Sequence, residues 1–199
     1  MAGPVWAGEV HSSKSVIPPQ DSCLCDWFVG ASAGYLIDFD EPMITAQFGK
    51  DLPVNLGGWC MAAYLEVGYT DKNDNRAFNP QRIPINIDEE LQVIPLTLNL
   101  KFERPISDNL NFYFGGGLGV AFTEFESRSL AAQIKENDTS FAAQVFIGLA
   151  YNVSKDFQVI GGARWMYVDF DSPGVPPIGD GDLDFSSQAF IELGVRYKF

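Results

Sequence analysis

The chain has 199 residues and a formal net charge of −13, from 13 Lys and Arg against 26 Asp and Glu. This acidic balance argues against nucleic-acid binding, which depends on basic side chains contacting phosphates. Apolar residues make up 46% of the chain, so it is not a disordered acidic tail. No window holds 18 consecutive apolar residues, which excludes a membrane-spanning helix. The 19 glycines, 16 Phe, 7 Tyr and 4 Trp favour many strands joined by turns.

Residues 1–25 are polar, contain Pro18-Pro19 and are expected to form an extended lead-in. Neither a charged region nor an apolar segment follows Met1, so a complete signal peptide is not present. Val5-Trp6-Ala7 nevertheless has the residue spacing of a cleavage site. We interpret the lead-in as including the tail of a processed signal peptide, and the alternative is a true cytoplasmic start. Residues 26–199 are predicted to form one β-barrel domain.

From Trp27 onwards, apolar residues alternate with small or polar ones at a period of two, which predicts eight strands. These strands are expected at residues 27–37, 43–50, 59–69, 93–102, 110–122, 141–153, 157–167 and 185–199. Pro95 removes one backbone donor from its strand and predicts a local bulge or bend. Ser129–Lys135 is the best candidate for a helix, and it is short.

The connections between these strands alternate in length, apart from a short first one. The short ones lie near residues 51–57, 103–109 and 154–156, and the others near 38–42, 70–90, 123–139 and 168–184. This pattern is typical of an antiparallel up-and-down barrel with one plain rim and one rim carrying longer loops.

One face of the predicted strands is strongly apolar, with aromatic residues near both strand ends and Leu, Val and Ala between them. This distribution indicates a lipid-facing band between two aromatic girdles. Strands of about 10 residues are long enough for a tilted bilayer crossing. A closed barrel also satisfies every backbone group without water. We therefore predict an eight-stranded transmembrane β-barrel. The alternative is a soluble lipocalin-like binder with the apolar face turned inwards.

Three segments carry a resemblance to known barrels. Residues 27–35 (WFVGASAGY) resemble a first strand, residues 113–119 (YFGGGLG) a Gly-rich central strand, and residues 196–199 (RYKF) a terminal strand. The family is that of the small eight-stranded outer-membrane β-barrels of Gram-negative bacteria, in the porin-like or opacity-type group. The resemblance implies a location in the cell outer membrane and contact with its lipid and lipopolysaccharide. It also implies that the barrel-assembly machinery reads Tyr197 and Phe199 during insertion. The three cysteines depart from the family pattern.

Five charged residues fall on the face opposite the apolar one, namely Glu66, Lys101, Arg164, Glu192 and Arg196. An eight-stranded barrel leaves room inside only for side chains. Buried charges need partners, so we expect these residues to form ion pairs in a packed, non-conducting interior. The alternative is that they line the path of a small porin-like channel.

Cys23 and Cys25 precede the first strand, and Cys60 lies near the same rim. In an oxidising periplasm we expect a disulfide between Cys60 and one of the other two. The alternative is a free, buried Cys60. With His11 as the single histidine, the chain lacks the ligands of a zinc site, and we expect no metal and no cofactor.

Residues 26–199 contain no histidine. Barrel enzymes that modify lipids resemble this chain in architecture, but they depend on a histidine to activate a nucleophile. We therefore expect no enzymatic activity, and a lipid-modifying enzyme is the less favoured alternative.

The predicted longer loops are acidic. Residues 38–42, 70–90, 124–138 and 169–184 carry −3, −2, −2 and −5, together −12 of the total −13. Such a rim could bridge through divalent cations to lipopolysaccharide phosphates, or it could serve only solubility. The predicted function is structural or surface-interactive, in envelope integrity or adhesion, with no surface ligand named.

Residues 180–184 (DGDLD) alternate carboxylates as calcium loops do. An EF-hand needs Glu at its twelfth position, where this chain has Ile191. We interpret this segment as a solvated acidic loop.

Overall fold

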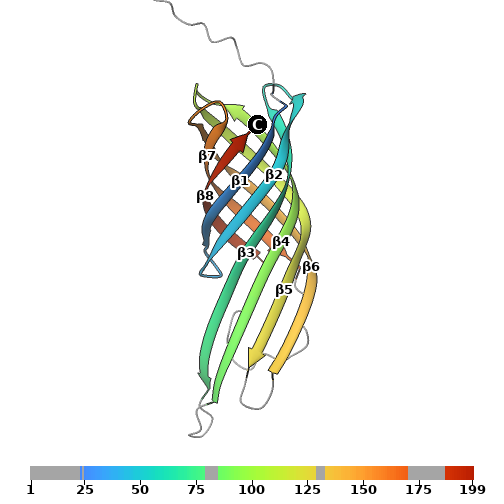
Figure 1. Ribbon diagram of the computed structural model, residues 1–199, viewed down its shortest axis with the longest axis vertical. Coiled ribbons are helices and arrows are strands. Elements are labelled where there is room, and N and C mark those ends of the chain that lie inside the picture. Colours follow the sequence, from blue (N-terminus) through green and yellow to red (C-terminus); the bar gives the residue numbers. More distant parts are fainter. Residues whose placement is uncertain (1–22, 24, 79–84, 129–132, 170–186) are drawn as a thin grey trace, which may run out of the picture.

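The computed structural model describes residues 23, 25–78, 85–128, 133–169 and 187–199, and for 73–78, 85–90, 125–128 and 133–136 only the backbone. The strands are β1 (Trp27–Leu36), β2 (Glu41–Asn55), β3 (Cys60–Phe78), β4 (Ile85–Pro105), β5 (Leu110–Arg128), β6 (Gln133–Asn152), β7 (Phe157–Val168) and β8 (Ser187–Lys198). Each pairs antiparallel with the next, and β8 pairs with β1 (Figure 1). The predicted eight-stranded up-and-down barrel is confirmed.

None of the described residues belongs to a helix of the length and apolarity needed to span a membrane.

The barrel closes where the first strand meets the end of the chain. The Trp27 backbone N–H donates to the Phe199 carbonyl at 3.1 Å, and the Phe199 N–H donates back to Trp27 at 2.9 Å. Where all eight strands are paired, closure leaves no free sheet edge, so the backbone polar groups of that part are satisfied without water.

Short turns gather at the rim that also holds the C-terminus, at the top of Figure 1. The β2–β3 turn shows why these connections are tight. Leu56 and Trp59 exchange backbone hydrogen bonds, and Gly57 and Gly58 between them have φ values of +63° and +89°. Glycine supplies these left-handed conformations without steric cost in a two-residue hairpin. Because short turns face the periplasm in barrels of this kind, the opposite rim is the outer one.

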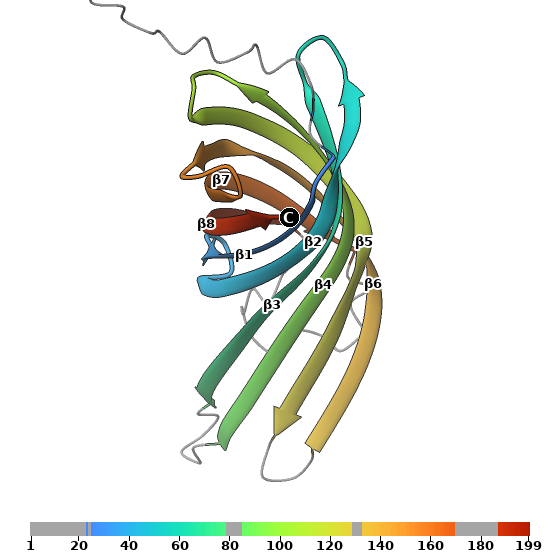
Figure 2. The same cartoon turned by 45° about the horizontal axis from the view of Figure 1, so that its top comes forward.

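Four strands extend well past the others at the outer rim. β3 and β4 stay paired as far as Phe78, and β5 and β6 as far as Arg128. The pairing of β2 with β3 ends at Tyr69, and that of β7 with β6 ends at Ala142. β3 to β6 therefore continue as a projecting four-stranded sheet (Figure 2).

This projecting sheet corrects two predicted loops, 70–90 and 123–139, because their described residues belong to strands. The predicted helix Ser129–Lys135 is also wrong at residues 133–135, which lie in β6, while 129–132 fall outside the described residues. Residues 70–76 contain no apolar residue, so the period of two stops there, while the backbone ladder continues.

Two further local predictions are corrected. β2 runs to Asn55, so most of the predicted turn at 51–57 is strand, with a register shift between Leu52 and Asn55. The bulge predicted at Pro95 is not found, because the β3–β4 pairs on either side, Val67↔Leu96 and Thr70↔Val93, keep one register.

The apolar face lies outside, as predicted. Leu98, Leu118 and Leu193 are 60%, 62% and 66% exposed. On the inner face Glu66 and Arg164 are 4% and 5% exposed. This arrangement is the reverse of a soluble barrel, and it leaves the lipid-facing belt apolar.

Candidate functional site in the barrel interior

The barrel interior is filled by side chains in layers along its length. Two buried apolar clusters lie towards its two ends. The outer cluster, towards the outer rim, comprises Leu36, Phe39, Met43, Leu91, Val93, Ala121, Ala142, Met166, Val168 and Phe190. The inner cluster, towards the short-turn rim, comprises Phe28, Ala62, Tyr64, Tyr113, Phe146, Ala150 and Ile160. Buried polar side chains occupy the space between and beside these clusters.

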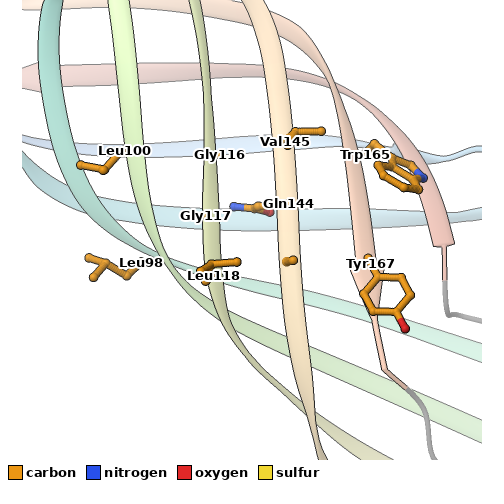
Figure 3. A pocket seen from close by; sticks show the side chains of 10 residues that line it. Leu98, Leu100, Gly116, Gly117, Leu118, Gln144, Val145, Trp165 and Tyr167 are labelled. Carbon is orange, nitrogen blue, oxygen red and sulfur yellow. The ribbon is translucent and has the colours of Figure 1, made fainter.

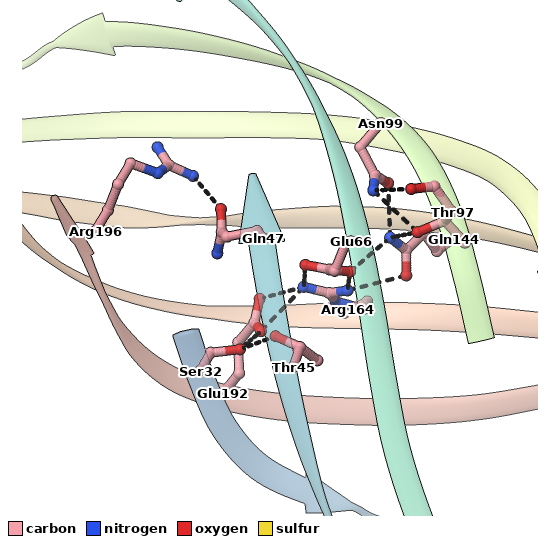
Figure 4. A network of polar contacts seen from close by, with 10 residues as sticks. All are labelled: Ser32, Thr45, Gln47, Glu66, Thr97, Asn99, Gln144, Arg164, Glu192 and Arg196. Carbon is pink, nitrogen blue, oxygen red and sulfur yellow. Dashed lines mark hydrogen bonds and ion pairs between the residues drawn. The ribbon is translucent and has the colours of Figure 1, made fainter. Parts of the chain in front are cut away.

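A central network is built around the guanidinium of Arg164 on β7 (Figure 4). Its Nη2 donates to both carboxylate oxygens of Glu192 on β8, at 2.9 and 3.0 Å. The same guanidinium pairs with Glu66 on β3 through both oxygens, with Nη2 3.1 Å from Oε2. Bidentate pairs of this kind are among the stronger charge-assisted hydrogen bonds.

Neutral side chains complete this central network. Gln144 accepts from Arg164 at 3.0 Å, and its Nε2 lies 2.6 Å from Asn99 Oδ1 and 3.0 Å from Thr97 Oγ1. On the other side, Ser32 Oγ donates to Glu192 at 2.7 Å. These neutral partners satisfy most of the polar atoms around the buried charges, while Arg164 Nε has no hydrogen-bond partner among the described residues.

A second charged group surrounds Glu103, nearer the short-turn rim. Lys101 Nζ pairs with Glu103 Oε2, and Arg196 Nη1 lies 3.8 Å from the same oxygen. Asn111 donates to Glu103 Oε1 at 2.6 Å, and Gln158 does so at 3.2 Å. The Glu103 carboxylate is thus surrounded by donors.

This second group extends to the inner cluster and to the short-turn rim. The Arg196 guanidinium lies 4.4 Å from the Phe28 ring centroid and donates to Gln47 at 2.8 Å. Lys198 pairs with Asp51 at 2.8 Å. The basic side chains are therefore held by an aromatic face and by acidic partners.

The structure brings the five charges singled out from the sequence into the interior, but into two groups. Glu66, Arg164 and Glu192 meet in the central network. Lys101 and Arg196 lie in the second group.

Sequence reasoning missed the partners of Lys101 and Arg196. Glu103 follows Lys101 by two residues and so shares its face, but the predicted strand ended one residue too early. The Lys198–Asp51 pair was also missed, because Asp51 falls in the predicted turn at 51–57. With Lys198, the two groups contain four acidic and four basic side chains, so their charges balance.

The β1–β2 turn covers the outer cluster. Phe39 is buried, and Lys72 lies over its ring at 4.7 Å while donating to its carbonyl at 2.7 Å. Asp40 adopts a positive φ of 61° and accepts a hydrogen bond from the Tyr35 hydroxyl. These contacts hold Phe39 against the interior.

A disulfide joins Cys23 to Cys60, the first residue of β3, and Cys25 is free and exposed. Tyr197 and Phe199 point outwards beside the seam, with their rings stacked 6.4 Å apart. The carboxylates of residues 180–184 lie outside the described residues. Among the side chains that the structure describes, no group of three His, Cys, Asp or Glu could hold a metal ion.

Residues 20–199 match the family described as the outer membrane protein beta-barrel domain. The chain belongs to this family. The match spans the whole barrel, and it places the protein in the outer membrane, as predicted. No curated protein matches the chain.

Three solved structures show the same fold. The Neisserial surface protein A (NspA) is 18% identical, with 87% of this chain and 97% of that chain covered and a TM-score of 0.52. Ail, the attachment invasion locus protein of Yersinia pestis, was solved with the heparin analogue sucrose octasulfate. It is 14% identical, with 87% of this chain and 97% of that chain covered and a TM-score of 0.51. A major outer membrane protein of Thermus thermophilus is 13% identical, with 88% of this chain and 100% of that chain covered and a TM-score of 0.61.

At these identities the likeness extends to the fold alone. Family membership gives this outer-membrane β-barrel protein a general role in the cell envelope or at its surface.

Proposed function

We propose that this outer-membrane barrel is a non-enzymatic structural or surface-interaction protein with a closed, non-conducting interior. The layered filling of that interior carries the proposal. An ion entering from the outer rim would meet Phe39 and the outer cluster, then the Arg164 network, then the inner cluster. Apolar constrictions exclude water and thereby block conduction.

A small porin-like channel is the alternative, and the network argues against it. Opening a path would separate Arg164 from Glu66 and Glu192, leaving buried charges unpaired. Breaking a buried ion pair in this way costs about 3–5 kcal/mol. Because the charges of the two groups balance, the interior exerts little net electrostatic attraction on an ion of either sign.

The surface role rests on the projecting sheet of β3 to β6. Residues 70–78 of β3 alone would extend about 30 Å along the strand, at roughly 3.3 Å per residue. The outer rim around this sheet carries acidic side chains, including Asp38, Asp40, Glu41 and Asp71. This combination favours a partner that is basic, or lipopolysaccharide phosphates bridged by divalent cations.

The names of two similar structures, a surface protein and an attachment protein, support the same class of role. The ligand class is expected to differ from that of Ail, which was solved with a heparin analogue. A polyanion of that kind would be repelled by the negative outer rim of this chain. During insertion, Tyr197 and Phe199 would supply the signal to the barrel-assembly machinery.

Planar-bilayer recordings test the closed interior. Protein refolded in detergent, with folding checked by a heat-dependent gel shift, is added to both sides of the membrane. We expect no steady unitary conductance. A reproducible conductance that disappears in Phe39→Trp or changes in Arg164→Gln would favour the channel instead.

A further inference from the structure

The lipid-facing surface is hollowed between β4 and β7. The groove has a volume of about 550 Å³ and an almost wholly apolar lining. Gly116 and Ala143 are the smallest outward residues of its lining. Leu98 and Leu100 lie on one side of the groove, with Trp165 and Tyr167 on the other (Figure 3).

Strand register explains the groove. One row of paired outward residues runs Leu100, Gly116, Val145 and Trp165 across the four strands. The next row runs Leu98, Leu118, Ala143 and Tyr167. The small residue is Gly116 on β5 in the first row and Ala143 on β6 in the second row. The hollow therefore crosses the belt diagonally, from β5 to β6.

Interior packing does not require this hollow. At the inward Gly119, a Cβ atom would lie 1.9 Å from the Leu96 carbonyl oxygen, so no side chain fits. At the outward Gly116, the nearest atom to such a Cβ is the Gln144 carbonyl oxygen at 3.0 Å, a tight contact but far less severe than that at Gly119. Ala143 likewise faces outwards, as Ala31, Ala46 and Ala163 do elsewhere on the belt, but only Ala143 lies beside Gly116 in the lining of this groove.

The polar atoms around the groove are already engaged by the protein. The Gln144 side chain turns inwards to the central network. Trp165 Nε1 donates to Ser187 Oγ at 2.8 Å, and the Tyr167 hydroxyl donates to Asp169 at 3.3 Å. An occupant would therefore meet hydrocarbon surface and would itself be hydrocarbon.

The groove is continuous with the lipid-facing belt of a protein that lies in the outer membrane. Trp165 and Tyr167 stand near the end of β7 that leads to the outer rim. We propose that the groove is a lipid site that holds one acyl chain of an outer-leaflet lipid. A second copy of the chain is the competing occupant. A two-fold contact centred here would place hollow against hollow and leave a void, which costs packing energy.

Native mass spectrometry tests the site. The protein is refolded in vesicles of palmitoyl-oleoyl phosphatidylethanolamine and phosphatidylglycerol, extracted in mild detergent and sprayed intact. Ala143→Leu fills the groove with a side chain common on the belt. Ala46→Leu makes the same change on the outward face of β2, across the barrel from β6. A gel shift on heating checks that each variant has folded, and Ala143→Val replaces Ala143→Leu should the latter fail.

We expect a one-lipid adduct on the wild type and on Ala46→Leu, reduced about tenfold in Ala143→Leu through lost apolar contact. The proposal is overturned by a wild type without a lipid adduct. It is equally overturned by an adduct that Ala143→Leu leaves unchanged or that Ala46→Leu removes as well. A dimer that Ala143→Leu dissociates would assign the groove to a second copy and would also overturn the lipid site.

Discussion

Arg164 on β7 and Glu66 on β3 meet across the full width of the barrel interior in a bidentate ion pair. The two strands are four positions apart in a closed sheet of eight, so the pair ties opposite walls together. Glu192 adds a second carboxylate to the same guanidinium. The pair therefore cross-links the barrel and also blocks its centre.

Removing this guanidinium should destabilise the barrel strongly. In Arg164→Leu, Glu66 and Glu192 lose their cation and face each other in the interior. We expect the free energy of unfolding to fall by about 3–5 kcal/mol, as for other broken buried pairs. Urea titration of vesicle-embedded protein, followed by tryptophan fluorescence, measures the change. Lys155→Leu, on the exposed β6–β7 turn, is the matched control and should lie within about 0.5 kcal/mol of the wild type. A similar small effect in Arg164→Leu would show that the network does not hold the walls together.

The Cys23–Cys60 disulfide should contribute to stability, because it closes a loop with a sequence separation of 37 residues. Cys23→Ser and Cys60→Ser should each lower the free energy of unfolding by about 2–4 kcal/mol. Cys25→Ser should leave it unchanged, since Cys25 is free. Reductant should reproduce the loss in the wild type and have no further effect on Cys60→Ser. Sensitivity of Cys25→Ser equal to that of Cys23→Ser would point to a different pairing.

Two glycine substitutions should separate inward from outward positions. Gly119→Ala would place Cβ 1.9 Å from the Leu96 carbonyl oxygen, and we expect it to prevent folding. Gly161→Ala would place Cβ 3.6 Å from Leu193 Cδ1, an ordinary contact, and should fold like the wild type. The heat-dependent gel shift after refolding reads out both variants. Normal folding of Gly119→Ala would mean that the β4–β5 contact is looser than described.

The acidic outer rim should bind lipopolysaccharide in a Mg²⁺-dependent manner. Glu41→Gln with Asp71→Asn removes two carboxylates near that rim and should weaken the binding, because Mg²⁺ bridges carboxylate and phosphate oxygens. Asp156→Asn, at the short-turn rim, is the control and should bind like the wild type. Titration of nanodisc-embedded protein with labelled lipopolysaccharide, with and without EDTA, measures the effect. Lipopolysaccharide binding that neither EDTA nor the double variant Glu41→Gln with Asp71→Asn weakens would exclude cation bridging.

Much of the membrane-spanning barrel could be predicted from the sequence. The strands from Trp27 to Leu36 and from Phe157 to Val168 show the period of two, because one face meets lipid and the other meets the packed interior. The same pattern placed Glu66 and Arg164 on the inner face. The projecting ends of β3 to β6 could not be recognised in this way, because the apolar alternation stops there, as at residues 70–76, and backbone pairing requires no particular residue types.

By itself, the sequence determined the strand count, the faces and the residues that point inwards, since these follow from local alternation along each strand. Tertiary structure alone decided which of those residues meet. Arg164 reaches Glu66 and Glu192 rather than Glu103 because closure and register set the heights of distant strands. The same register lines up Gly116 with Val145, and Leu118 with Ala143, to form the groove. Such relations span tens of residues in the chain, and no local pattern encodes them.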